Sequence, residues 1–163
     1  MGPDEVHTLV VVTGRLSATL FVAALCGAVL PWRAVQLWVG FLSAHTIHFA
    51  AVLSFAILNK GRDLFPGGMS LADAGGWPAL AASATFFYSL AVTNLVSMRR
   101  GPRAGRWLRL AGPIAASLIG SMFLATYMPL VGISAFFAIP VLAVSAALVT
   151  YLWRTFRRPM VPS

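Results

Sequence analysis

The chain divides into five long apolar stretches, and this division constrains its fold more than any other feature. Of its 163 residues, 59% are hydrophobic and 10% are charged, whereas a soluble domain carries roughly 25% charged residues. A helix needs about 20 apolar residues to cross a bilayer, and the stretches reach that length. Their apolar residues are continuous rather than alternating, which argues against a transmembrane β-barrel. The sequence therefore predicts an all-α, polytopic membrane bundle of about five transmembrane helices, in a single domain over residues 1–163.

The predicted spans are bounded by prolines, glycines and basic residues. They cover residues 8–30, 34–58, 77–98, 110–128 and 133–153. A glycine-rich loop separates the second span from the third, and the basic segment RRGPRAGRWLR separates the third from the fourth. Pro129 is expected to end the fourth span, and Pro140 is expected to kink the fifth. Small residues at four-residue spacing, such as Gly112 and Gly120 on either side of Ala116, should let helices approach closely.

Basic residues are distributed unequally between the two ends of these spans. With five spans, nine arginines fall on the side of the C-terminus, while Lys60, Arg62 and Arg15 fall on the side of the N-terminus with all four acidic residues. Lysine and arginine in short loops mark the cytoplasmic face. The sequence therefore predicts an N-terminus outside and a cytoplasmic C-terminus, in a bacterial-type inner (plasma) membrane.

The net charge of +8 has a membrane explanation. The arginine clusters act as topology signals and attract anionic headgroups, so membrane lipids are expected partners. Nucleic acid is not an expected partner, because the basic segments lack interleaved aromatic residues and a soluble scaffold.

Two histidines stand close together in FLSAHTIHFAAVL, residues 41–53. His45 and His48 are three residues apart, close to one helical turn, so both rings should project from one face. They lie about 16 and 21 Å from the cytoplasmic edge of the second span, near the middle of a ~30 Å hydrocarbon core. A neutral histidine there can bind a metal ion or haem iron. Alternatively, each ring donates a hydrogen bond to a serine, threonine or carbonyl on a neighbouring helix. The candidate partners are Thr46, Ser83, Thr85 and Ser89.

Four short motifs resemble, in their order, the ferric reductase-like transmembrane group of the cytochrome b type. They are TGRLSATLF in the first span, AHTIHFAAVL in the second, GGWPALAASAT at the start of the third and RWLRLAG before the fourth. The resemblance covers nearly the whole chain. It implies that haem b is held between histidines of two helices, that electrons cross the membrane through it, and that His45 or His48 is an axial ligand.

The chain differs from this group in the second ligand. No histidine follows His48, and Arg109 stands about where a later-helix histidine would be expected. Two histidines on one turn of one helix cannot reach opposite faces of a single iron, which excludes bis-histidine haem through His45 and His48. Three alternatives remain open: a five-coordinate haem, a haem whose second ligand is Met122, or a bundle that binds a quinone or a neighbouring subunit instead.

Arg15 is a charged residue within the first span. It lies about 10 Å below the outer edge if that span starts near residue 8. It can extend its guanidinium to the surface. It can also clamp an anion, such as a haem propionate or a lipid phosphate, because no carboxylate lies within any predicted span.

Two functions follow from these features. The first is a small redox-type membrane subunit that binds haem b or a quinone through His45, His48, Arg15 and Met122, and exchanges electrons with an electron-donor protein or other membrane subunits. In this interpretation His45 and His48 are also the candidate metal ligands. The second is a non-catalytic structural or accessory subunit of a larger membrane complex. The sequence contains no nucleophile elbow, phosphate loop or C-x-x-C pair, so enzymatic activity stays an open question at this point.

Overall fold

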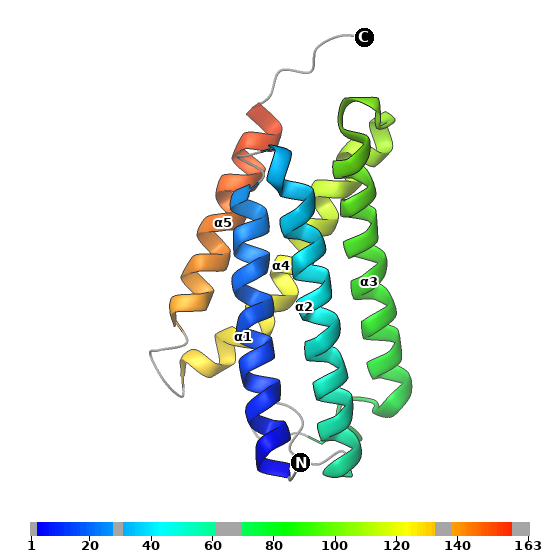
Figure 1. The fold of residues 1–163 in the computed structure, drawn as a ribbon, viewed down its shortest axis with the longest axis vertical. Helices are drawn as coiled ribbons and strands as arrows, with labels where there is room; N and C mark the ends of the chain where they lie inside the picture. The colour runs from blue at the N-terminus through cyan, green and yellow to red at the C-terminus, as the bar shows by residue number, and fades with distance from the viewer. Residues whose placement is uncertain (1–2, 28–30, 61–69, 133–137, 158–163) are drawn as a thin grey trace.

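The computed structural model describes residues 3–27, 31–60, 70–132 and 138–157, which form long α-helices and one short 3₁₀ helix. The elements are α1 (Pro3–Gly27), α2 (Pro31–Leu58), α3 (Gly76–Arg100), η1 (Gly101–Arg103), α4 (Arg106–Val131) and α5 (Ala138–Arg157). Each α-helix is long and apolar enough to cross a membrane. Figure 1 shows them side by side in one bundle. The predicted all-α bundle with five candidate transmembrane helices is confirmed, and its orientation across a membrane stays a prediction.

The helices extend beyond several of the predicted span boundaries. α1 begins at Pro3 and α4 begins at Arg106, whereas the predicted spans begin at residues 8 and 110. Polar residues continue a helix past the apolar segment because backbone hydrogen bonding does not stop where the hydrocarbon does. The predicted end of the first span, at residue 30, and the predicted start of the fifth span, at residue 133, lie outside the described residues.

One expectation about prolines is corrected by these boundaries. Pro129 does not end the fourth helix, because α4 continues to Val131. A proline removes one N–H donor, and so near a helix end the loss is confined to the last turn. Pro140 is the third described residue of α5. Residues 133–137, which precede α5, lie outside the described residues, so the expected kink at Pro140 stays a prediction.

The helices pack in a ring that is nearly open at one seam. α1 makes its most extensive contact with α2, and α4 lies between α3 and α5, which also touches α1. Few residues connect α2 directly with α3. The ring order is therefore α2, α1, α5, α4, α3, and the seam between α3 and α2 is the least tightly packed.

An aromatic cluster fills the middle of this ring. Phe21, Trp38 and Phe41 are fully buried, with ring centroids 5.1–6.0 Å apart, and Phe87 and Phe123 join them. Trp38 Nε1 donates a hydrogen bond of 2.9 Å to the Ala91 carbonyl, which satisfies the polar end of the indole. The cluster therefore packs the part of α2 just before the histidines against α1, α3 and α4.

The small residues of α4 form two close helix contacts. A Cβ added at Gly112 would lie 2.6 Å from Cβ of Ser97 on α3, and one at Gly120 would collide with Leu148 on α5. Both glycines are buried. The expectation that this stripe permits close helix approach is confirmed.

Candidate functional site

His45 and His48 project from the middle of α2 towards α1, where each ring meets a hydroxyl. His45 Nδ1 lies 3.0 Å from Ser17 Oγ, and His48 Nδ1 lies 3.2 Å from Thr13 Oγ1. The three-residue spacing on α2 matches the four-residue spacing on the antiparallel α1, because both are about one turn. The ring centroids of the two histidines are 5.8 Å apart. The prediction that the two rings share one helix face is confirmed.

The hydroxyl partners are not the ones that the sequence suggested. Thr46, Thr85 and Ser89 donate instead to carbonyls one turn earlier in their own helices, which is a common bond for hydroxyl residues within helices. Sequence reasoning missed Thr13 and Ser17. The signal that would have identified them is their one-turn spacing within TGRLSATLF, opposite a one-turn histidine pair.

The contacts of Thr13 determine which nitrogen of His48 carries the proton. Thr13 has one hydroxyl proton, and its Oγ1 lies 2.7 Å from the Leu9 carbonyl oxygen, one turn earlier in α1. Because Thr13 donates to Leu9, the bond with His48 is donated by the ring, and Nδ1 carries the proton. In a neutral imidazole Nε2 then keeps its lone pair. Histidines that bind metals are oriented in the same way, by a hydrogen bond from the other ring nitrogen.

His45 is held between a buried serine and an aromatic wall. Ser17 is fully buried, and its hydroxyl is able to donate to Nδ1 of His45 or to accept from it. The His45 ring stacks on Phe87 with centroids 3.8 Å apart and an interplanar angle of 22°. Phe123 approaches the same ring edge-on, at 6.1 Å. These contacts fix the plane of the imidazole.

Gly14 gives the His48 ring its space against α1. A Cβ added at Gly14 would lie 3.0 Å from Cε1 of His48 and 3.4 Å from Nδ1, closer than ordinary van der Waals contact between carbons. The missing side chain therefore allows the imidazole to lie directly on the α1 backbone, within reach of Thr13.

His45, His48 and Met122 line one cavity of about 190 Å³, which we call the histidine cavity. The other lining side chains include three phenylalanines and three hydroxyl residues: Phe49, Phe87, Phe123, Ser83, Thr126 and Tyr127. The described residues contain no buried side-chain nitrogen or oxygen without a partner, and the histidine bonds above go through Nδ1. Because the bonds to α1 engage Nδ1, Nε2 is the ring nitrogen that remains for a ligand in the cavity that both histidines line.

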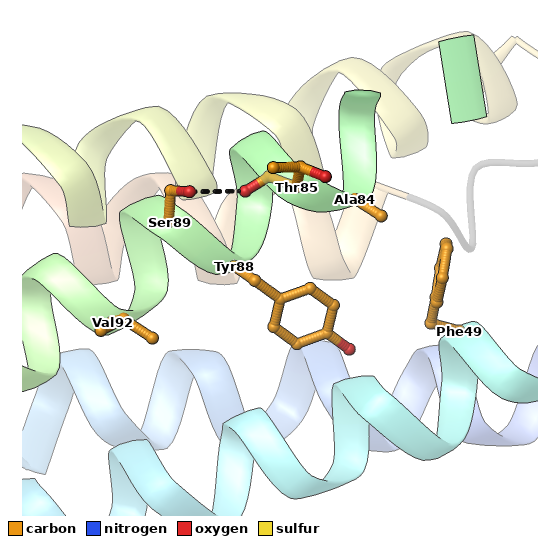
Figure 2. Close-up of a pocket in the computed structure, with 6 residues that line it drawn as sticks. All are labelled: Phe49, Ala84, Thr85, Tyr88, Ser89 and Val92. Carbon is orange, nitrogen blue, oxygen red and sulfur yellow. Dashed lines mark hydrogen bonds between the residues drawn. The ribbon is translucent and has the colours of Figure 1, made fainter. Parts of the chain in front are cut away.

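The histidine cavity adjoins a wider groove at the seam between α2 and α3. Figure 2 shows this groove, which has a volume of about 600 Å³ and is lined by Phe49, Ala84, Thr85, Tyr88, Ser89 and Val92. Phe49 and Ala84 line both spaces. Tyr88 crosses the seam and donates a 3.0 Å hydrogen bond to Thr46 on α2. The two shared residues, Phe49 and Ala84, therefore separate the histidine cavity from the groove.

The structure separates Arg15 from the two histidines. Arg15 lines another cavity, of about 270 Å³, between α1, α4 and α5. Tyr127 borders both cavities. The candidate span of α1 begins at Glu5, so Arg15 lies about 15 Å along it, deeper than the sequence predicted. Of the predicted site residues, Met122 shares a cavity with His45 and His48, and Arg15 does not.

Metal binding by His45 and His48 stays a prediction. Within residues 3–27, 31–60, 70–132 and 138–157, no three His, Cys, Asp or Glu side chains come together in a way that could hold a metal ion. Structural metal sites usually have four protein ligands and catalytic ones three. The pair would therefore need ligands of another kind, such as the Met122 thioether or a bound cofactor.

The dimensions of the histidine cavity fit a single ring better than a haem. An apolar cavity of about 150 Å³ accommodates benzene, and sites for drug-sized ligands occupy roughly 300–1,000 Å³. A volume of about 190 Å³ therefore suits one substituted six-membered ring. Haem b, a macrocycle of four pyrrole rings, does not fit between these side chains as they stand.

Comparison of the chain with protein-family models, with curated proteins and with solved structures gives no match. The resemblance to the ferric reductase-like transmembrane group therefore stays a prediction based on the four motifs. Fold and composition define a membrane protein built from helices long and apolar enough to span the bilayer.

Proposed function

We propose that the chain is a small redox-type subunit of a bacterial-type inner (plasma) membrane, which binds the ring of a quinone-class molecule in the histidine cavity. The ligand exchanges electrons with an electron-carrying partner protein. The observation that carries this proposal is the pair of imidazoles that line one cavity while their Nδ1 atoms bond to α1, which leaves Nε2 of each ring for a ligand.

The protonation of His48 matches the reduced form of such a ligand. Because Thr13 donates to Leu9, Nε2 of His48 is an acceptor and is able to take a hydrogen bond from a quinol hydroxyl. A hydroxyl donor held by a neutral imidazole in an apolar cavity contributes more than it would in water, since water does not compete. The oriented Nε2 atom therefore selects the hydroxyl form of the ring.

The walls of the cavity and the groove suit the rest of the molecule. Phe87 and Phe123 border the histidine cavity, and aromatic rings pack on one another with favourable geometry. The apolar tail of a quinone would leave past Phe49 and Ala84 into the groove between α2 and α3 (Figure 2). Headgroup and tail therefore each have a space of matching polarity.

The experiment is a calorimetric titration of the purified protein in mild detergent with a short-tailed benzoquinol. His48→Phe removes the acceptor, and His7→Phe makes the same change at an exposed ring outside the cavity. Because His48→Phe removes one buried hydrogen bond to the quinol, it should weaken quinol binding about tenfold. His7→Phe removes no such bond and should leave quinol binding unchanged. Wild-type protein that does not bind the quinol, or equal affinities for the two variants, would contradict the proposal.

The visible spectrum of the same preparation tests the haem version. A Soret band that disappears in the His45→Ala, His48→Ala double variant would show that haem b occupies the site. Such a result would require the aromatic walls to separate on binding, because the histidine cavity is too small for haem as it stands.

One observation favours the alternative of a non-catalytic accessory subunit. Both imidazoles already have partners on α1, and histidine–hydroxyl bonds between helices stabilise membrane bundles without any ligand. Colourless protein that binds no quinol and is present at full occupancy in a multi-subunit complex would support this alternative.

A further inference from the structure

Thr126 of α4 is a polar residue of the histidine cavity that quinol binding through His48 does not use. It lines the cavity, and its side chain is exposed. Its hydroxyl donates a 2.9 Å hydrogen bond to the Met122 carbonyl, one turn earlier in α4. A hydroxyl has one proton, so a hydroxyl that donates to its own helix is an acceptor towards a ligand. Thr126 therefore offers the cavity a hydrogen-bond acceptor.

Within the described part of the chain, this bond distinguishes Thr126 from the other hydroxyl residues of the cavity. Ser83 and Tyr127 also line it, and a hydroxyl whose proton is uncommitted serves as donor or acceptor, whichever the ligand requires. A group whose proton is committed discriminates between ligands that donate and ligands that accept. Thr126 meets this condition as His48 does, because the proton of His48 is directed at Thr13.

Thr126 and His48 lie at the same level of the bundle. α2 and α4 run in the same direction, as Figure 1 shows, and Phe123 of α4 meets the His45 ring edge-on, with centroids 6.1 Å apart. His48 follows His45 by three residues, and Thr126 follows Phe123 by three. Both therefore lie about 4.5 Å further along their helices, which places the two acceptors in one layer of the cavity.

The two acceptors belong to different walls of the cavity. In the ring of helices, α1 and α5 separate α2 from α4 on one side, and α3 separates them on the other. A flat aromatic ring between these walls presents opposite edges to His48 and to Thr126. A benzoquinol has a hydroxyl donor at each of two opposite edges, whereas the quinone has a carbonyl acceptor at each.

We propose that Thr126 is the second hydrogen-bond acceptor of this site, and that His48 and Thr126 together select aromatic rings with hydroxyls at opposite positions. The inference rests on the proposed function and adds a specificity-determining residue on α4. The oxidised ring leaves its own carbonyls and both protein acceptors unpaired, so it binds more weakly than the reduced ring. A site of this kind takes up the reduced molecule and releases the oxidised one.

The experiment is a calorimetric titration of the purified protein in mild detergent, in the absence of oxygen. The probes are a short-tailed benzoquinol and the phenol that carries the same tail and only one hydroxyl. The wild-type protein should bind the benzoquinol roughly three- to tenfold more tightly, because the second hydroxyl adds one hydrogen bond. Thr126→Val keeps the shape of the side chain without the acceptor and should abolish this preference. Thr126→Ser keeps the hydroxyl and should retain the preference.

Thr150→Val is the matched control. Thr150 is exposed on α5, donates to the Ala146 carbonyl of its own helix and lies outside the histidine cavity, so this variant should retain the preference for the benzoquinol. His48→Phe should weaken benzoquinol binding, which tests the proposed function separately.

Two groups of outcomes separate this inference from the proposed function. Wild-type protein that binds neither probe would contradict both. If benzoquinol binding depends on His48, the role of Thr126 is overturned by equal wild-type affinities for the two probes, by a preference that persists in Thr126→Val, or by an equal loss in Thr150→Val. The proposed function stands in each of these three cases.

Discussion

The hydrogen bond between Ser17 and His45 should contribute measurably to the stability of the bundle. Ser17 is fully buried, and its Oγ lies 3.0 Å from Nδ1 of His45, within the ordinary range for a nitrogen–oxygen hydrogen bond. Hydrogen bonds between membrane helices contribute about 0.6 kcal/mol on average and up to about 1.7 kcal/mol. Ser17→Ala should therefore raise the unfolding equilibrium constant by a factor of roughly 3 to 18.

A double-mutant cycle separates this bond from simple loss of packing. The cycle combines Ser17→Ala with His45→Phe, which keeps a ring against Phe87 but has no nitrogen. Replacing both partners by apolar groups costs less than the sum of the single changes, so a coupling energy of about 0.6–1.7 kcal/mol is expected. The assay is reversible unfolding in mixed micelles, followed by tryptophan fluorescence.

Ser54→Ala is the matched control for this cycle. Ser54 is exposed on the same helix as His45, and its hydroxyl donates to the Ala50 carbonyl of its own helix. A surface change of this kind should alter stability by less than about 0.5 kcal/mol. If Ser17→Ala destabilises no more than Ser54→Ala, or if the coupling energy is zero, the imidazole is not held by Ser17 and the reasoning about the site fails.

Three further predictions concern packing, pH and topology. Gly112→Ala should destabilise the bundle by about 1–3 kcal/mol in thermal unfolding, because its Cβ would collide with Ser97 of α3. Gly40→Ala is the control: a Cβ there meets no side chain or neighbouring helix within 4 Å, so this change should not destabilise the bundle. Equal effects would refute the close α3–α4 contact. Hydrogen bonds from the hydroxyl and the backbone amide of Ser70 lower the pKa of Asp73 below its ordinary 3.8. Their contribution to the stability of the turn before α3 is therefore complete above pH 3.8 and is lost as the pH falls through the lower pKa of the folded state. Hydrogen exchange of this turn should show the step, and Asp73→Asn should remove it. In a background without the native cysteine, an impermeant thiol reagent should label Lys60→Cys from outside and not Arg103→Cys, and the reverse pattern would overturn the predicted orientation.

The architecture was predictable because the bilayer restricts the available structures. Apolar length and the placement of arginines identify helices and their number, since an irregular backbone cannot be satisfied in hydrocarbon. Helix ends were less predictable. α4 continues past Pro129, because the effect of a proline depends on its distance from a helix end, which the sequence does not show.

The site was predictable in its main residues and not in its partners. His45 and His48 stand out because titratable rings are rare in apolar spans. The hydroxyls that orient them belong to α1, and choosing Thr13 and Ser17 requires the relative rotation of two helices. The same limit applies to Arg15, which is close to Thr13 and Ser17 in sequence yet faces another cavity. Periodicity places residues on a face, and only helix packing determines what that face meets.

Photoaffinity labelling tests the central claim most directly. A short-tailed azidoquinone would be bound to the protein, activated by light, and its adducts located by peptide mass spectrometry. The account predicts adducts on the walls of the histidine cavity, at Phe49, Phe87 or Tyr127, and their loss in His48→Phe. Adducts elsewhere that an excess of unlabelled quinol does not suppress, or labelling that is unchanged in His48→Phe, would contradict it.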